Sequence, residues 1–395
     1  MIDIQEALSL VESHSQTLGE ETRAAVDSVG HVLAEDILAD VDSPPHDKAL
    51  VDGFAIQAAD WNRELRVIEE VIASQVPTKK IEPGTASQIM TGAPIPTGAD
   101  AMVMVEDCVV ESGHVRINRE AKPDQHIMPR ATSFAKGNVV LSKGTRIRPI
   151  EVGLLSEVGR DQISCFRKPS VAVLPTGEEL VHATATPGPG QIRNSNGPML
   201  TARAKAAACT VHQLDVAKDN VDDLRAKIER RLESDILILS GGVSAGVRDL
   251  VPPTLEALGV RQVFHKVRLK PGKPIWFGVH EGTKRTLVFG LPGNPVSSLV
   301  CFELFVQTAI RCLSGCGATA TKRFVRLGEE LQICGGRPVF YPAKTYLDER
   351  QLCAKPIAWK GSSDMLTISK ADCLIFLESG DRTYLAGEIL SSISI

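Results

Sequence analysis

Three glycines and two serines fall within the seven residues Ser240–Gly246 (SGGVSAG), directly after the apolar run Asp235–Leu239. Glycines leave the backbone free to turn its N–H groups toward an anion, and a helix that follows would add the positive end of its dipole. Glycine-rich segments also form tight strand-to-helix turns that bind no ligand. On this segment alone, both interpretations stand.

Two lysines three residues apart lie in the segment Lys270–Pro274 (KPGKP). Pro271 and Pro274 stiffen the loop and lower the entropy cost of holding Lys270 and Lys273 in place. The two ammonium groups could therefore point at one anion. The alternative is a pair of solvated surface lysines, and we favour the anion site because of the prolines.

Acidic residues lie just after expected strands, or in the loops beyond them, at Glu179, Asp219 and Asp249. Carboxylates together with phosphate oxygens are the usual ligands of Mg²⁺. Each acid taken singly is better explained as a helix N-cap or a solvated side chain, and Asp249 follows a glycine-rich loop where a cap would be welcome. Their common placement beside a candidate phosphate loop raises the metal hypothesis above its base rate.

Strands and helices alternate in the part of the chain that carries these residues, from about residue 170 to 315. Apolar runs predict strands at Val171–Pro175, at Asp235–Leu239 and in TLVFG, which precedes Leu291. Helices are expected over about 198–208, in NVDDLRAKIERRL and in VSSLVCFELFVQTAI. This alternation predicts βαβ units and a parallel sheet.

Open parallel sheets bind ligands at the carboxyl ends of their strands. Three polar segments fall there: Thr176–Glu179 (TGEE), Ser240–Gly246 and Leu291–Ser297 (LPGNPVS). We therefore expect these segments to meet at one edge of the sheet.

The remaining chain has a different character. Ile4, Ala7, Leu8 and Val11 share one helical face behind a capping-box spacing of Asp3 and Glu6, which predicts an N-terminal helix. The segment SPPHD, beginning at Ser43, is a helix-ending signal, and residues 51–117 are expected to be mostly β, with AMVMVEDCVV and HVRI as a hairpin around Ser112-Gly113. In VDGFA, Asp52 and Gly53 alone predict a turn. The last 75 or so residues indicate a small all-β domain.

Composition narrows the function classes. The chain has 395 residues, a formal charge of −4 and 43% hydrophobic residues, which is typical of a soluble protein of roughly two to four domains. A strongly basic face for nucleic acid is not expected, and no apolar run approaches a membrane span. Nine cysteines without a CxxC pair favour a reducing cytoplasm, and nine histidines without HExxH disfavour a zinc hydrolase.

Seven segments of the chain resemble, in order, motifs of one known family. They are SPPHDKALVDGFAI, IMTGAPIPTGADAMVMVED, LPTGEEL, GQIRNSNGPML, LSGGVSAGVRD, LKPGKPIWFG and GLPGNPVSS. The series is similar to the molybdopterin molybdenumtransferases, the MoeA and gephyrin E-domain family. The similarity runs from the first helix to the C-terminus and is weakest over 120–135 and the last 75 residues.

The resemblance implies a multi-domain α/β fold in an elongated homodimer. It implies a discontinuous helical domain (1–44 and 138–168), a β-rich domain (45–137), a molybdopterin-binding α/β domain with a parallel-type sheet (169–318) and a C-terminal β-barrel (319–395). The activity it implies is Mg²⁺-dependent insertion of molybdate into adenylylated molybdopterin, with release of AMP, in the cytoplasm. The expected partners are these small molecules, a second copy of the chain and the molybdopterin adenylyltransferase, but no nucleic acid or membrane.

The family's functional positions carry over residue by residue. The resemblance implies catalytic roles for Asp52, Thr91, Glu179, Asp219 and Asp249, with Asp219 and Asp249 as magnesium ligands. It implies molybdate binding by Lys270 and Lys273 and a pocket floor shaped by Pro292 and Pro295. Substrate contacts are further expected from Ser240, Gly241, Gly242, Ser244, Asn294 and Ser297. Asp52 and Thr91 are expected to face the active site of the partner subunit.

Three positions depart from the family pattern. Met128 and Ser133 stand where the motif NVRxxGED would place Arg and Asp, and Pro342 stands where GRxxFxRG would place an Arg. Lys344, two residues further on, is a candidate substitute for that Arg. The lost charges leave two alternatives open beside the enzyme: a molybdopterin-binding carrier or scaffold with weakened turnover, and an enzyme that prefers tungstate.

Overall fold

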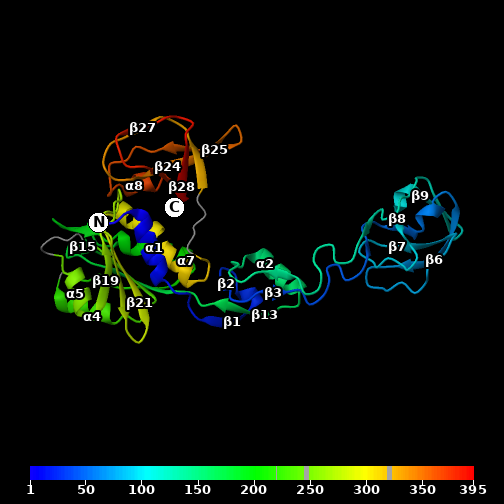
Figure 1. Cartoon of the computed structure of the whole chain (residues 1–395), viewed down its shortest axis with the longest axis horizontal. Coiled ribbons are helices and arrows are strands. Elements are labelled where there is room, and N and C mark those ends of the chain that lie inside the picture. Colours follow the sequence, from blue (N-terminus) through cyan, green and yellow to red (C-terminus); the bar gives the residue numbers. More distant parts are fainter. Residues whose placement is uncertain (219, 244–248, 318–322) are drawn as a thin grey trace.

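The structure, a computed structural model, describes residues 1–218, 220–243, 249–317 and 323–395. Figure 1 shows an elongated molecule. The α/β part and the C-terminal barrel lie at one end, a small unit follows in the middle, and a β-rich part lies at the opposite end. All nine cysteines are free thiols. The multi-domain α/β fold that the sequence predicts is confirmed, while the domain boundaries stay a prediction.

A six-stranded sheet forms the centre of the α/β part. Its strands are β14 (Ser170–Pro175), β17 (Thr210–Gln213), β18 (Ile236–Ser240), β19 (Val260–His265), β20 (Trp276–Glu281) and β21 (Arg285–Leu291). The order is β17-β14-β18-β21-β20-β19, and the first four neighbours are parallel. Strand β20 pairs antiparallel with β19 on one side and with β21 on the other. The links 266–275 and 282–284 between these strands are too short for the helical crossover that a parallel pair needs.

Helices cover both faces of this sheet. They are α3 (Asn196–Ala206), α4 (Val221–Glu229), α5 (Val251–Ala257), α6 (Pro295–Cys301), the π-helix η4 (Phe302–Val306) and α7 (Gln307–Leu313), and a short pair, β15 (Leu180–Val181) and β16 (Ile192–Arg193), follows β14. Successive strand residues point to opposite faces. Thus Val173 and Ile238 pack in one apolar cluster with α3 and α6, while Leu174 and Leu239 pack in another with α4 and α5.

The continuous helical stretch Pro295–Leu313 is the one described segment whose length and composition would allow it to cross a membrane. Within its most apolar window, 83% of the residues are buried inside the protein. The stretch contributes Val296, Val300 and Ile310 to the larger apolar cluster of the sheet. Its apolar character is therefore explained by burial in the core.

The middle unit consists mostly of short strands. Its elements are β1 (Glu20–Ala24), η1 (Ala25–Asp27), β2 (Val32–Leu33), β3 (Ile37–Leu38), β12 (Val139–Leu141), α2 (Pro149–Glu157) and β13 (Gln162–Phe166). The resemblance implied a helical domain, but α2 is the α-helix that this unit holds. The N-terminal helix α1 (Ile4–His14), capped by Asp3 as predicted, packs on the α/β core, because Ala7 and Val11 are buried with residues of α7. The helix-ending role expected for SPPHD is wrong, since α1 ends at His14.

The β-rich part is built on a second six-stranded sheet. Its elements are β4 (Lys48–Ala49), β5 (Gly53–Ile56), η2 (Ala58–Asp60), β6 (Glu64–Val71), β7 (Thr85–Ile89), β8 (Ala101–Met104), η3 (Val105–Asp107), β9 (Cys108–Glu111), β10 (His114–Ile117) and β11 (Ile127–Met128). The predicted hairpin is confirmed for β9 and β10, where Ser112 and Gly113 both have positive φ. The first half of AMVMVEDCVV departs from the expectation: η3 interrupts it, and β8 lies at the other edge of the sheet.

The C-terminal residues form a closed barrel with the order β22-β25-β24-β26-β28. The elements are β22 (Arg323–Leu327), β23 (Leu331–Ile333), β24 (Val339–Asp348), β25 (Gln351–Pro356), α8 (Met365–Ile368), β26 (Cys373–Leu377), β27 (Arg382–Tyr384) and β28 (Ile389–Ser394). Phe340 and Leu374 belong to the apolar cluster of the α/β sheet. The barrel is therefore packed on the α/β part by shared core residues.

A buried carboxylate fixes the chain where it enters the α/β sheet. Asp235, which is 2% exposed, accepts two hydrogen bonds from Arg167 at 2.9 Å and two from Ser170 at 2.7 Å. It also forms an ion pair with Lys284 at 3.0 Å. Burial alone would raise the pKa of Asp235, but the bonds from Arg167, Ser170 and Lys284 outweigh it and lower the pKa to about 2. The charged form of Asp235 therefore stabilises the fold.

The change Asp235→Asn is expected to lower the free energy of unfolding by about 3 kcal/mol at pH 7, because it leaves Arg167 and Lys284 without their carboxylate. The pKa of Asp235 is depressed in the folded state, so this difference is present above the ordinary value of 3.8 and shrinks as the pH falls toward 2. Urea unfolding between pH 3 and 7 measures it, with Glu233→Gln as an exposed control. A difference that does not depend on pH would show that Asp235 acts by packing rather than by charge.

Candidate functional site

Three loops meet at the carboxyl edge of the parallel strands, as the sequence predicts. In the sheet register, Pro175 of β14 lies beside Ser240 of β18, and Ser240 lies beside Leu291 of β21. The loop backbones are joined directly: Thr176 N–H donates to the Ser240 carbonyl at 2.9 Å, and Gly241 N–H donates to the Leu291 carbonyl at 3.0 Å. The segments after the three strands therefore form one continuous rim.

Close packing at this rim explains two of the glycines. Gly241 has φ +105°, and a Cβ there would lie 2.5 Å from the Thr176 carbonyl oxygen. Gly242 has φ +65°, and a Cβ there would lie 2.9 Å from Cγ2 of Val251. The turn interpretation thus holds for both residues, and the Gly241 N–H already has a protein acceptor. Ser244, the other serine of the segment, lies outside the described residues.

A cavity of about 640 Å³ opens above this rim, a size typical of small-molecule sites. Seven of the predicted site residues line it: Glu179, Ser240, Gly241, Gly242, Asp249, Asn294 and Pro295. Thr176 of the predicted segment Thr176–Glu179 lines it too, together with residues for which the sequence predicted no role, among them Arg193 and Asn196. We call it the large cavity.

Asn196 is the residue that holds two walls of the large cavity together. Its Nδ2 donates to Ser240 Oγ at 2.8 Å and to the Gly293 carbonyl at 2.7 Å. Its Oδ1 is buried and has no hydrogen-bond partner among the described residues. A buried acceptor of this kind is costly unless a ligand donor or water satisfies it. The motif GQIRNSNGPML contains this residue, but its composition alone indicated only the start of a helix.

A second cavity, of about 490 Å³, lies between the α/β sheet and the barrel. Five predicted residues line it: Lys270, Lys273, Pro292, Asn294 and Ser297. The barrel side contributes Arg337, Trp359 and Lys360. Because Asn294 lines both spaces, this cationic cavity adjoins the large cavity.

The barrel is fixed to the lysine loop by backbone hydrogen bonds. Lys270 N–H donates to the Pro338 carbonyl, and Phe340 N–H donates to the Lys270 carbonyl, both at 2.9 Å. Arg337 then reaches across the joint, and its Nη1 donates to the Leu269 carbonyl at 3.1 Å. As a result, guanidinium and ammonium groups from separate domains line one space, and no described carboxylate lines it.

Arg337 changes the meaning of the Pro342 departure. Pro342 lies within β24, where it pairs with Leu374. Lys344, the candidate substitute, forms an ion pair with Asp372 at 3.0 Å and does not line the cationic cavity. The hypothesis that Lys344 replaces the missing Arg is therefore wrong. Arg337 and Lys360 supply barrel cations instead, and sequence spacing did not reveal them because the barrel's position on the sheet was not predictable.

The acids of the metal hypothesis are only partly described. Glu179 and Asp249 line the same large cavity, and Asp219 lies outside the described residues. Among the residues that the structure describes, no three His, Cys, Asp or Glu side chains are grouped to hold a metal ion. Two carboxylates do fit Mg²⁺, which commonly takes one or two protein carboxylates together with substrate phosphate oxygens and water.

Asp52 and Thr91 form a pair at the far end of the molecule. The Thr91 N–H and hydroxyl both donate to Asp52 Oδ1, at 2.6 and 2.7 Å, and these bonds lower the pKa of Asp52 below its ordinary value. Both residues are exposed at the sheet of β5 and β7, on the β-rich part that Figure 1 places opposite the α/β part. They line neither cavity of their own chain.

The other two departures lie outside both cavities. Met128, in β11, pairs with Lys48, and Ser133 N–H donates to the Ser43 carbonyl at 2.8 Å on the connection to the β-rich part. A charged side chain at either position would therefore not line the two cavities of the same chain.

The sequence matches three family models along nearly its whole length. Residues 2–159 match the MoeA N-terminal region (domain I and II), residues 172–311 the probable molybdopterin binding domain, and residues 325–394 the MoeA C-terminal region (domain IV). The chain is 33% identical over 403 residues to a molybdopterin molybdenumtransferase of Staphylococcus aureus, covering 99% of this chain and 95% of that protein. It is 34% identical to one of Staphylococcus epidermidis, covering 93% and 89%.

The fold also matches a solved structure over its full length. The molybdopterin biosynthesis MoeA protein from Pyrococcus horikoshii OT3 superimposes with a TM-score of 0.85 at 30% identity, covering 100% of both chains.

The cationic cavity leads to a prediction about oxyanion binding. Lys273→Ala and Arg337→Ala should each weaken the binding of molybdate by about 1.5–3 kcal/mol, because each removes one charge-assisted contact. Equilibrium dialysis of the intact protein measures this, with Lys344→Ala as a matched control that removes a barrel lysine outside the cavity. Equal affinity of all three variants would remove Lys273 and Arg337 from the oxyanion site.

Proposed function

Because this chain belongs to the MoeA family of molybdopterin molybdenumtransferases, we propose that it inserts molybdate into adenylylated molybdopterin with Mg²⁺ and releases AMP. Family membership gives the enzyme class and the place in molybdenum cofactor biosynthesis. The observation that carries the finer proposal is that a cationic cavity and an acid-bearing cavity adjoin at Asn294.

The cationic cavity suits the oxyanion. Lys270, Lys273 and Arg337 face one space between the sheet and the barrel, so a dianion held there would be neutralised by preorganised charges. The prolines of the loop and the hydrogen bonds to the barrel keep these groups in position before the ligand arrives. The oxyanion would thus be bound next to the organic substrate without a large movement of the protein.

The large cavity suits the molybdopterin nucleotide. The roughly planar, polar parts of the nucleotide would contact the rim of Thr176, Ser240 and Gly241. A hydrogen-bond donor on the ring or the sugar of the nucleotide would satisfy the buried Oδ1 of Asn196. Glu179 and Asp249 would hold Mg²⁺ against the phosphate oxygens, where the ion neutralises charge as AMP departs.

Release of AMP separates this proposal from the carrier alternative. The intact protein is incubated with adenylylated molybdopterin, molybdate and Mg²⁺, and AMP is quantified by chromatography. We expect AMP in amounts that exceed the protein. Tight substrate binding without AMP would instead support a carrier whose turnover was lost with the charges at positions 128 and 133. Replacing molybdate by tungstate in the same assay tests the oxyanion preference.

The role of Asp249 gives a sharper test. Asp249→Asn keeps the size of the side chain and removes the charge that binds a hard cation, so AMP release should fall by at least tenfold and high Mg²⁺ should restore part of it. Glu256→Gln, which neutralises an exposed carboxylate on α5, is the matched control. If the Mg²⁺ dependence of Asp249→Asn equals that of the parent, Asp249 serves the loop rather than the ion.

We further propose that each active site is shared by two chains. The Asp52–Thr91 pair lies on the β-rich part, at the opposite end of the molecule from the two cavities, so it can complete a site only on another copy of the chain. A two-fold dimer would then contain two equivalent shared sites.

Complementation tests the shared site. Asp52→Ala and Asp249→Ala are each expected to be inactive, and mixing them should restore up to about a quarter of the parent activity. The reason is that roughly half of randomly exchanged dimers are mixed, and each mixed dimer has one site with both acids. Subunit exchange is confirmed with two affinity tags. Exchange without any recovered activity would mean that Asp52 does not act in the partner's site.

A further inference from the structure

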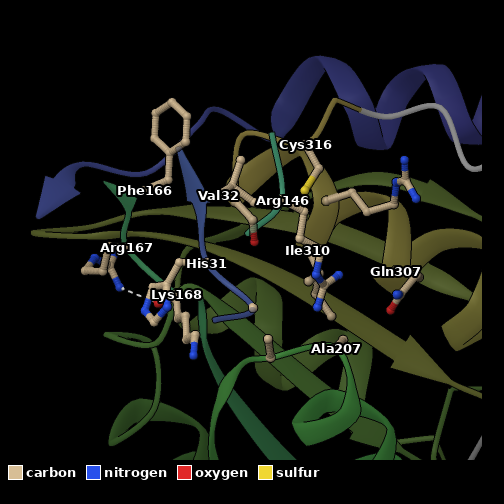
Figure 2. Close-up of a pocket in the computed structure, with 14 residues that line it drawn as sticks. His31, Val32, Arg146, Phe166, Arg167, Lys168, Ala207, Gln307, Ile310 and Cys316 are labelled. Atoms are coloured by element: carbon tan, nitrogen blue, oxygen red, sulfur yellow. Dashed lines mark hydrogen bonds between the residues drawn. The ribbon is translucent and has the colours of Figure 1, made fainter. Parts of the chain in front are cut away.

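A small, partly open cavity lies at the seam between the middle unit and the α/β part, and it shares no lining residue with the large cavity or the cationic cavity. Its volume is about 30 Å³. The middle unit contributes residues 30–32 and Arg146, the connection to the sheet contributes residues 166–168, and the α/β part contributes residues 207–208 and the stretch from Gln307 to Cys316. Figure 2 shows His31, Arg167 and Lys168 on one side of this seam cavity and Gln307 on the other.

Basic residues predominate among the polar residues that line the seam cavity. Its basic lining residues are His31, Arg146, Arg167, Lys168 and Arg311, and no carboxylate from the described residues lines it. Arg167 already binds Asp235. The side chains of Arg146 and Lys168 form no hydrogen bond or ion pair with any described residue; Lys168 is half-buried, whereas Arg146 is exposed. Two positive charges that face one space without a counterion repel each other unless an anion lies between them.

His31 adds an unsatisfied acceptor. The side chain is 3% exposed, and its Nδ1 lies 3.2 Å from the Ser28 carbonyl, which can only accept. Nδ1 therefore carries the proton in the neutral ring, and Nε2 is left with a lone pair. Nε2 is buried without a hydrogen-bond partner, and the Glu21 carboxylate, 3.6 Å away, cannot donate to it.

Burial, together with the charges of Lys168 and Arg23, lowers the pKa of His31 below its ordinary value. The Ser28 carbonyl and Glu21 act in the opposite direction but do not outweigh burial. The ring is therefore neutral at pH 7, and its Nε2 needs a donor. On the facing side, Gln307 Oε1 is a second buried acceptor without a hydrogen-bond partner among the described residues.

We propose that the seam cavity binds a tetrahedral oxyanion that carries an O–H group, of which hydrogen phosphate is the simplest. Arg146 and Lys168 supply donors and positive charge for the unprotonated oxygens, and His31 Nε2 or Gln307 Oε1 accepts the hydrogen bond from the O–H. The volume is roughly two to three times what a single water needs on the same measure, which fits an ion of this size and excludes a nucleotide.

The chemistry distinguishes this site from the cationic cavity at the lysine loop. Sulfate and molybdate have the same shape and charge as hydrogen phosphate but are fully deprotonated at pH 7, so neither can donate to His31 or Gln307. The seam cavity should therefore prefer phosphate to sulfate and molybdate. The bound ion would connect Arg146 and Lys168 with α7 and hold the middle unit, and with it the β-rich part, against the α/β core.

Calorimetric titration tests this in full-length protein carrying Lys270→Gln and Lys273→Gln, which removes two of the four cations that line the other cationic cavity and so reduces its contribution. The probes are inorganic phosphate, sulfate and molybdate at pH 7. We expect one phosphate per chain, binding at least tenfold more tightly than sulfate or molybdate. Adding Arg146→Gln and Lys168→Gln should weaken phosphate binding at least tenfold, while Lys136→Gln, an exposed lysine outside the cavity lining, should leave it unchanged.

Histidine NMR of the same protein supplies a second measurement that does not require the Arg146→Gln and Lys168→Gln variants to fold. A bound dianion should raise the pKa of His31 on phosphate addition, and His31→Gln assigns its signal. No saturable phosphate binding, or binding that survives Arg146→Gln with Lys168→Gln, would overturn the site. Sulfate bound as tightly as phosphate, with no change at His31, would overturn the assignment of an O–H donor. Because the lysine loop is disabled here, these outcomes are independent of molybdate insertion.

Discussion

The alignment of three parallel strand ends is the constraint on which the rest of the site depends. Pro175, Ser240 and Leu291 lie side by side in the sheet, so the loops after them must share one rim. The rim is so closely packed that a Cβ at Gly241 would meet the Thr176 carbonyl. Such packing leaves the backbone of the rim little conformational freedom. The rim therefore fixes Asn294, which lines both cavities, and Pro292, which lines the cationic cavity.

The second cavity exists because the barrel is packed on that rim. Backbone hydrogen bonds between the lysine loop and residues 338–340 fix the barrel at the open side of the sheet, and Phe340 buries itself in the sheet's own apolar cluster. This contact brings Arg337 beside Lys270 and Lys273. A cavity lined by positive charges is thus produced jointly by two domains, and the proline at position 342 does not remove the barrel's contribution.

Local patterns in the sequence predicted the features that depend on residues near one another in the chain, such as helix caps, turns and strand ends. Asp3 caps α1, Ser112 and Gly113 form the hairpin turn, and the polar ends of three apolar strands meet at one edge. Contacts between segments distant in the chain were not predictable. The Arg337 contact depends on how the barrel docks, and the two hydrogen bonds of Asn196 depend on the loop at Gly293. The pattern of α1 predicted its buried face, which includes Ala7 and Val11, but it did not predict that α7 would be the helix packed against it.

The elongated shape separates the two cavities of the α/β part from the Asp52–Thr91 pair on the β-rich part. The large cavity has carboxylates and a neutral rim, whereas Asp52 is held in its charged form by Thr91 at the other end of the chain. The middle unit lies between the α/β part and the β-rich part (Figure 1). Beside the seam cavity, Arg167 at the end of the middle unit donates two hydrogen bonds to the buried Asp235 of the sheet. Any geometry in which Asp52 reaches a second chain's cavity therefore depends on how the middle unit is held against the α/β part. The Arg167–Asp235 contact is one part of this joint, and the packing of Phe166 against Cys316 is another.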